Sequence, residues 1–189
     1  MSVRTQKSAP WLLGLGLSLG AAAIVAVIAG GGSSSDAPIA ASSGSATPAA
    51  RGPAVPTNEF EFFDGSTATL AHYQGEPLVI NFWASWCPSC VAEMSAALRP
   101  VQELRGDEVA FVGFNIQDDR GRALALVEDT GVLFDLAEDA RGDLYTEFGG
   151  IGMPFTVFVS ADGEVMHKHN GPVTEGQLND LINEHLTGA

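Results

Sequence analysis

The sequence predicts an α/β fold in which helices flank a mixed central sheet. Residues 78–83 form a continuous apolar run broken only by Asn81, which is typical of a central strand buried on both faces. A helical pattern separates this run from a second apolar strand at 109–116, so the two strands should pair in parallel through a crossover. Residues 155–169, centred on an Asp-Gly turn, predict an antiparallel hairpin, which makes the sheet mixed.

The other elements follow from hydrophobic periodicity and turn residues. The helix after the first strand should end at Gly106, and its apolar residues recur at helical spacing: Val91, Met94, Leu98, Val101 and Leu104. The remaining elements expected are a hairpin of 60–63 and 67–70 around Asp64-Gly65, a helix at 119–130, an apolar segment at 132–136, a short helix at 139–148, the hairpin strands 155–159 and 164–169, and a terminal helix at 174–186.

Composition divides the 189 residues into four regions. Residues 1–10 are polar and include two basic residues, and residues 11–30 then carry no charge over a length sufficient for one helical crossing of a bilayer. By the positive-inside rule we expect a cytoplasmic N-terminus and a single-pass anchor in the cell membrane. A cleaved signal peptide, which would leave a secreted protein, is the alternative. Residues 31–57, rich in Gly, Ser, Ala and Pro, predict a flexible linker, and 58–189 a single folded domain.

The exported part of the chain is strongly acidic. All 23 acidic residues but only seven of the nine basic residues follow the apolar segment, which leaves a net charge near −16 there. Such a charge argues against nucleic acid as a partner, because phosphate binding requires basic side chains.

Both cysteines lie in the stretch Trp86-Cys87-Pro88-Ser89-Cys90, between the first strand and its helix. With no third thiol available, this placement predicts a catalytic dithiol. Cys87 would sit at the positive end of the helix, where backbone NH groups favour the thiolate, and would be the attacking nucleophile. If Pro88 opens the helix, Cys90 falls one turn on and would be the resolving thiol. A static disulfide is less favoured because so small a loop stabilises little, and zinc because no second ligand pair occurs.

Three segments resemble the thioredoxin superfamily, and within it the exported TlpA-like or ResA-like thiol:disulfide oxidoreductases. Val79 to Cys90, followed by Glu93-Met94, is similar to that family's strand, active-site turn and helix start. Gly152 to Thr156 is similar to the loop whose proline is cis and faces the cysteines, and 113–148 to the extra helix and strand of this family. The resemblance covers nearly all of 58–189. It implies a thioredoxin-like fold with an N-terminal hairpin and a central helix-strand insertion, and no cofactor or metal.

The resemblance also implies roles for individual residues. A cis bond between Met153 and Pro154 would leave the Met153 backbone free to pair with an extended substrate segment. Trp86 and Pro88 would contribute to the same substrate-binding surface. Glu93, one helical turn beyond Cys90, would exchange protons with that thiol if burial raises its pKa, with an exposed helix glutamate as the alternative.

Some positions depart from the family pattern. Asn81 replaces a buried aspartate of many thioredoxins, and Ser95 a proline that kinks the active-site helix. Gly150 and Ile151 replace a more usual branched-then-polar pair. The alternating His167 and His169 predict either a solvated strand or, less favoured, a metal site.

Taken together, these features predict two-step thiol-disulfide exchange outside the cytoplasm. By resemblance we expect a reductase of exported proteins such as apocytochrome c, recharged by a membrane electron donor. The alternatives are a disulfide-forming oxidase, which would need a membrane electron acceptor, and a binding module that captures thiol-bearing clients without turnover. A peroxidase of related fold is disfavoured, since the Thr and Arg support of a peroxidatic cysteine is missing near Cys87.

Overall fold

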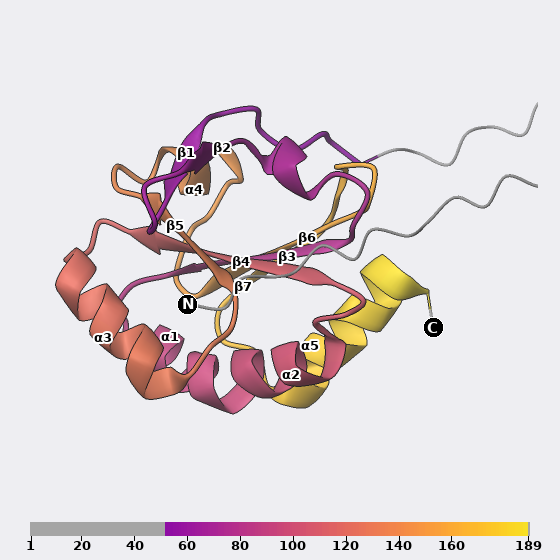
Figure 1. Ribbon diagram of the computed structural model, residues 1–189. Coiled ribbons are helices and arrows are strands. Elements are labelled where there is room, and N and C mark those ends of the chain that lie inside the picture. Colours follow the sequence, from indigo (N-terminus) through magenta and orange to yellow (C-terminus); the bar gives the residue numbers. More distant parts are fainter. Residues whose placement is uncertain (1–51, 189) are drawn as a thin grey trace, which may run out of the picture. The chain divides into compact units, whose positions relative to one another are not determined.

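The computed structural model describes residues 52–188 (Figure 1). The predicted cytoplasmic segment 1–10, the anchor 11–30 and residues 31–51 of the linker lie outside the described residues, so these assignments stay predictions. Among residues 52–188, none of the helices combines the length and the apolarity that a membrane crossing requires.

A seven-stranded mixed sheet forms the centre of the domain, in the order β2-β1-β5-β4-β3-β6-β7. Helices α1, α2, α3 and α5 cover one face of the sheet, and α4 lies on the other face, near the edge that the β1–β2 hairpin forms (Figure 1). The predicted α/β fold is therefore confirmed. The strands are β1 (Phe60–Phe62), β2 (Thr67–Ala68), β3 (Leu78–Trp83), β4 (Ala110–Ile116), β5 (Asp135–Asp139), β6 (Phe155–Val159) and β7 (Val165–Asn170). The helices are α1 (Pro88–Glu93), α2 (Arg99–Arg105), α3 (Arg120–Thr130), α4 (Asp143–Glu147) and α5 (Glu175–Ile182).

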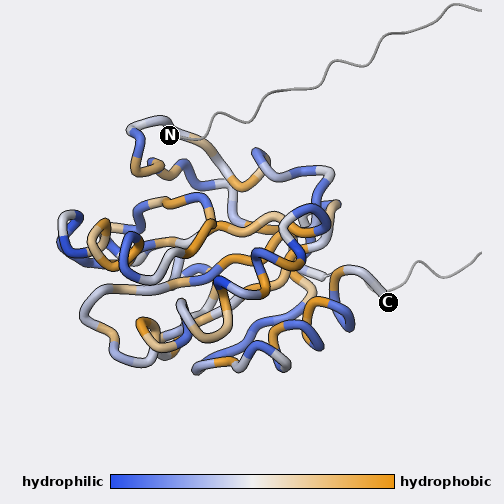
Figure 2. The backbone as a smooth tube through the Cα atoms, turned by 60° about the horizontal axis from the view of Figure 1, so that its bottom comes forward, coloured by the Kyte–Doolittle hydropathy of each residue, from blue (hydrophilic) through white to orange (hydrophobic). Residues whose placement is uncertain are grey.

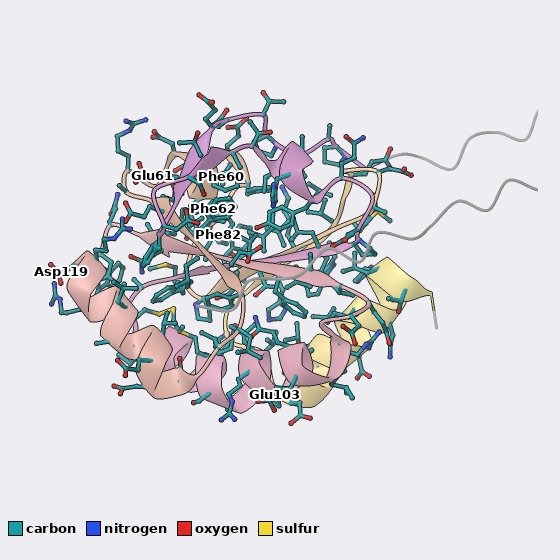
Figure 3. All side chains as sticks on the ribbon, in the orientation of Figure 1. Phe60, Glu61, Phe62, Phe82, Glu103 and Asp119 are labelled. Carbon is teal, nitrogen blue, oxygen red and sulfur yellow. A yellow bond between two sulfur atoms is a disulfide. The ribbon has the colours of Figure 1, made fainter. Side chains whose placement is uncertain are left out.

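Strand β3 is the central strand that its apolar run predicts. It pairs in parallel with β4 and antiparallel with β6, and every residue in it is buried. Its side chains alternate between two cores, with Trp83 on the side of the four-helix layer and Phe82 on the side of the hairpin. Figure 2 shows the hydrophobic residues concentrated along the inner strands, and the hairpin core is rich in aromatic rings, with Phe60, Phe62 and Phe82 labelled in Figure 3. Two packed layers thus hold the C-terminal end of β3, where the cysteine turn begins.

The helix after the cysteines is present but is interrupted by one π turn, Met94–Leu98, between α1 and α2. Pro100 has no NH to donate to the preceding turn, and the Arg99 NH bonds instead to the Met94 carbonyl. The extra residue of a π turn rotates everything that follows. Leu104, predicted on the apolar face, is consequently 67% exposed, while Gln102 is buried in α2.

The stretch between β4 and β6 differs most from prediction. The strand is β5, Asp135–Asp139, three residues later than the expected apolar segment at 132–136, and the short helix is α4, which begins four residues after the predicted 139. Phe134 is buried as a loop residue because its ring lies where a side chain at Gly113 would be. Asp139 ends the strand, and its carboxylate accepts hydrogen bonds from the NH groups of Leu144 and Tyr145 in the first turn of α4.

The N-terminal residues of the described region pair with the turn between β6 and β7. The Pro53 carbonyl accepts from the Val165 NH at 2.8 Å, and the Val55 NH donates to the Gly163 carbonyl at 3.0 Å. Packed structure therefore begins before residue 58, inside the stretch that the sequence assigned to the linker.

His167 of β7 packs against the π-helical turn Asn183–Thr187 that follows α5. His167 and His169 lie on the half-buried face of the strand, and the His167 ring stacks on His185 with centroids 4.3 Å apart. Within residues 52–188, no three ligand-type side chains are arranged to hold a metal ion. The expected solvated strand is thus solvated on one face only.

Candidate active site

The two cysteines form a disulfide at the point where β3 leads into α1. A turn connects the two elements, closed by a hydrogen bond of 3.1 Å from the Cys87 NH to the Ala84 carbonyl. Pro88 occupies the first turn of α1, as predicted, and Cys87 caps that helix by accepting the Cys90 NH at 3.2 Å. Both cysteines are buried, Cys87 at 5% and Cys90 at 1% exposure. Cys87 is thus the cysteine nearer to solvent, as a nucleophile should be.

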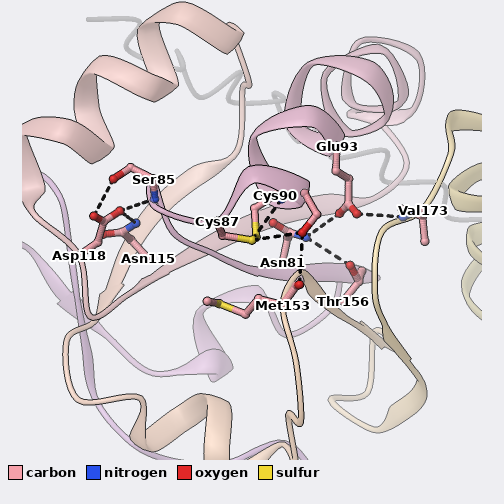
Figure 4. The surroundings of a disulfide bond; sticks show 11 residues. Asn81, Ser85, Cys87, Cys90, Glu93, Asn115, Asp118, Met153, Thr156 and Val173 are labelled. Carbon is pink, nitrogen blue, oxygen red and sulfur yellow. Dashed lines mark hydrogen bonds between the residues drawn. A yellow bond between two sulfur atoms is a disulfide. The ribbon is translucent and has the colours of Figure 1, made fainter.

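The Met153-Pro154 loop lies against the cysteine turn. Its peptide bond is cis, as expected from the resemblance. The Ser89 hydroxyl donates to the Met153 carbonyl at 3.4 Å and lies 3.5 Å from Cys87 Sγ (Figure 4). The structure therefore brings together the two segments, 64 residues apart, that the sequence assigned to one site.

An open groove of about 600 Å³ runs beside Cys87. Trp86, Pro88, Arg141, Tyr145 and Met153 are among the residues that line it. The Trp86 side chain is half exposed, so the groove presents an apolar surface next to a reactive sulfur. An extended peptide segment could occupy such a groove.

The unusual Gly150 has a packing reason. A Cβ at this position would lie 2.2 Å from the Tyr145 ring, and the Gly150 NH donates to the Tyr145 carbonyl at 3.0 Å. A side chain here would displace the tyrosine from the groove wall. The neighbouring Ile151 is 87% exposed beside the groove loop, where it adds apolar surface.

Glu93 is buried, at 3% exposure, one helical turn beyond Cys90. Its Oε1 accepts from Asn81 Nδ2 at 3.1 Å and its Oε2 from the Val173 NH at 2.9 Å (Figure 4). Burial raises the pKa of the carboxyl to about 7, against the lowering effect of these two hydrogen bonds. The exposed-glutamate alternative is therefore wrong, and the group can gain or lose a proton near neutral pH.

Asn81 connects Glu93 to β6. Its Nδ2 also lies 3.2 Å from Thr156 Oγ1, while its Oδ1 has no hydrogen-bond partner among residues 52–188. Because an amide carries both a donor and an acceptor, Asn81 can pair with an ionised Glu93 in one orientation and with a protonated one in the other. Asn81 is thus a polar partner suited to both states of the carboxyl.

A second carboxylate near the turn was missed by sequence reasoning. Asp118, in the loop after β4, accepts from the NH and the hydroxyl of Ser85 and from Asn115 Nδ2 (Figure 4). Burial alone would raise the pKa of Asp118, but these hydrogen bonds and one from the Asp119 NH outweigh it and lower the pKa. Ser85 and Asp118 are 33 residues apart, and no local pattern in the sequence pairs them.

The fold and the site define the class of this protein as an α/β domain of thioredoxin-like fold with a Cys-Pro-Ser-Cys disulfide facing a cis-proline loop. The Redoxin family model matches residues 43–183, and the chain belongs to this family. The thiol:disulfide interchange protein DsbE of Vibrio cholerae is 34% identical over 111 residues, which are 58% of this chain and 58% of the relative.

Solved structures agree with this assignment. A secreted disulfide oxidoreductase of Mycobacterium tuberculosis, described as homologous to Escherichia coli DsbE, matches with a TM-score of 0.58 and 28% identity, covering 66% of this chain and 96% of that one. A thiol:disulfide interchange protein of Chlorobium tepidum matches in fold, with a TM-score of 0.60, 22% identity and coverage of 72% and 98%. The chain spans less than two thirds of the length of the curated relatives that it matches.

Proposed function

We propose that this protein catalyses thiol-disulfide exchange outside the cytoplasm and that it reduces disulfides of exported proteins. One observation carries the proposal: the Cys87–Cys90 disulfide closes at the start of α1, at the edge of an open groove and against the Met153-Pro154 loop. The matching relatives are named thiol:disulfide interchange proteins, which supports the same chemistry. No metal or cofactor is needed for it.

The reaction proceeds in two displacements. In the first, the Cys87 thiolate attacks a substrate disulfide, forms a mixed disulfide and releases one substrate sulfur as a thiolate. In the second, the Cys90 thiolate attacks Cys87 Sγ, the Cys87–Cys90 bond forms and the second substrate sulfur leaves. Two electrons pass to the substrate, and the protein ends in the disulfide state that the structure describes.

Proton movement accompanies the second displacement. Cys90 must lose its proton before it can attack, and burial makes its thiolate costly. Glu93 lies one turn away with a pKa of about 7, which suits a group that takes up this proton and returns it when the disulfide is reduced again. Its two hydrogen bonds to Asn81 and Val173 hold the carboxylate in place.

The groove provides for protein substrates. Trp86 and Pro88 offer an apolar wall, and the Met153 backbone precedes β6 at the position where an extended segment could pair with it. We propose clients such as apocytochrome c, a membrane electron donor that recharges the dithiol, and attachment to the cell membrane through residues 11–30. This part rests on the family resemblance and on the composition of the N-terminus.

The reduction potential of the dithiol tests the direction. A value well below about −180 mV, together with a reduced pair in living cells, supports the reductase, whereas a higher value with an oxidised pair would indicate a disulfide-forming oxidase. Insulin reduction by dithiothreitol tests turnover itself. An unaccelerated reaction would leave only a binding module.

A further inference from the structure

The turn that ends at Cys87 is stabilised by hydrogen bonds from its second residue, Ser85, to a residue outside the turn. In the turn Ala84-Ser85-Trp86-Cys87, the hydrogen bond that closes the turn joins Cys87 to Ala84. The NH of the second residue has no partner within a turn of this kind. Here the Ser85 NH donates to Asp118 Oδ2, and the Ser85 hydroxyl donates to Asp118 Oδ1 at 2.7 Å. One carboxylate therefore binds both hydrogen-bond donors of this residue.

The next residue of the turn is held by the same loop. Trp86 Nε1 donates to the Gln117 carbonyl at 3.2 Å. Gln117 has a φ of 45°, the one non-glycine residue with positive φ in the described part of the chain. Such backbone conformations cost free energy and are retained where the surroundings impose them. The Gln117 side chain also donates to the Arg141 carbonyl at 3.0 Å, which connects two segments that line the groove.

Asp118 is itself fixed. Its Oδ2 accepts from Asn115 Nδ2 at 3.0 Å, and its Oδ1 from the Asp119 NH at 2.8 Å. Asn115 lies beside Trp83 in the β3–β4 register, so the carboxylate is anchored at the strand ends from which the turn departs. Four donors on one carboxylate keep it ionised and immobile.

We propose that Asp118 is a positioning residue for the exchange reaction: acting through Ser85, it fixes the turn that presents Cys87 to the substrate. This inference rests on the proposed function. Cys87 Sγ accepts the Cys90 NH at 3.2 Å only while the turn keeps the sulfur over the start of α1. A looser turn would weaken this hydrogen bond to the thiolate and misplace the nucleophile in the groove.

The test compares Asp118→Asn with Asp119→Asn. Both variants remove one negative charge from the same loop, but Asp119 points outward and contacts no residue of the turn through its side chain (Figure 3). In Asp118→Asn an amide NH₂ group faces donors that need an acceptor. The measurements are the rate at which the reduced protein attacks oxidised glutathione, and the Cys87 pKa from thiolate absorbance.

We expect Asp118→Asn to slow the attack about tenfold, equivalent to about 1.4 kcal/mol, and to raise the Cys87 pKa. Asp119→Asn should keep the wild-type rate within about twofold and should not raise that pKa. If the charge alone mattered, both variants would lower the Cys87 pKa, because each removes a negative charge near the thiolate. That result, or a wild-type rate in Asp118→Asn, would overturn the proposal.

Ser85→Ala provides an independent variant should Asp118→Asn fail to fold. It deletes one of the two hydrogen bonds and should by itself slow the attack about threefold. Where Asp118→Asn does fold, adding Ser85→Ala to it should cause no further loss. An unchanged rate in Ser85→Ala, or additive effects, would contradict action through Ser85. The wild-type protein separates the two proposals: if it does not react with glutathione disulfide, the proposed function fails, whereas a reactive wild type with an equally reactive Asp118→Asn refutes only the positioning role.

Discussion

Glu93 and Asp118 are two carboxylates near one cysteine turn, and the protein treats them in opposite ways. Glu93 is buried with two donors, and its pKa rises to about 7. Asp118 is half-buried with four donors. Its pKa is lowered, although burial by itself would raise it, as it does for Glu93. The comparison shows that deeper burial with two donors leaves Glu93 able to exchange a proton near neutral pH, whereas shallower burial with four donors keeps Asp118 a fixed negative anchor.

The largest expected effect comes from removing Cys90 Sγ, the sulfur with which Glu93 is proposed to exchange a proton. Cys90→Ser should abolish multiple turnover yet retain the first attack, so mixed disulfides with clients should accumulate through Cys87. Trapped complexes on a non-reducing gel, identified by mass spectrometry, measure this. Cys87→Ser is the matched control and should trap nothing. The reverse pattern would exchange the roles of the two cysteines and associate Glu93 with the nucleophile instead.

Glu93→Gln tests the proton-exchange half of the comparison. We expect turnover at pH 7 to fall about 100-fold, with the first attack by Cys87 little changed, because an amide cannot accept the Cys90 proton. The pH dependence of the second displacement near pH 7 should disappear in stopped-flow traces. Glu103→Gln, an exposed carboxylate on the following helix, should behave as wild type (Figure 3). An unchanged pH profile in Glu93→Gln would leave the buried carboxyl without a catalytic role.

Glu93 also makes the free energy of unfolding depend on pH in a defined direction. Since the folded pKa is raised from 4.5 to about 7, the folded state retains a proton that the unfolded chain releases, and stability falls as pH rises between these values. The loss is roughly 3 kcal/mol. Urea unfolding of the oxidised protein from pH 4 to pH 8 measures it. Glu93→Gln should flatten this slope, and a slope that persists in the variant would assign it to other groups.

For Asp118 we expect a smaller pH dependence of stability, of opposite sign. Its folded pKa lies below 3.8, so its contribution to stability is present above that value and is lost as pH falls below it. Asp118→Asn should make acid unfolding below pH 4 less steep while leaving the slope above pH 4.5 unchanged. Circular dichroism during acid titration would show this. A variant that flattens the neutral slope instead would mean that the two carboxylates are not independent.

The sequence was most informative where local patterns determine structure. The apolar run of β3, the placement of Cys87 before Pro88 and the hairpin of β6 and β7 all depend on neighbouring residues, and all were predicted. The cis bond before Pro154 required the family resemblance, because nothing in the local sequence separates it from an ordinary proline at the start of a strand.

Prediction failed where long-range packing overrides local pattern. β5 is polar at both ends, so the strand was predicted too early, at the more apolar residues before it. Two of these, Val132 and Phe134, are buried in a loop. The π turn was overlooked because its cause, Pro100, lies after the segment it distorts. Asp118 was missed because its proposed role depends on hydrogen bonds from Ser85. The two residues come together only because the parallel strands β3 and β4 end side by side.

The two edges of the sheet have a consequence for self-assembly. β2, at one edge, is only two residues long. At the other edge, the first residue of β7 donates its NH to the Pro53 carbonyl, and the strand carries the exposed Lys168. Short, covered and charged edge strands resist pairing with other chains. A protein proposed to handle extended clients meets many segments able to add to a sheet. Protected edges would direct such segments to the cysteine groove and limit aggregation elsewhere.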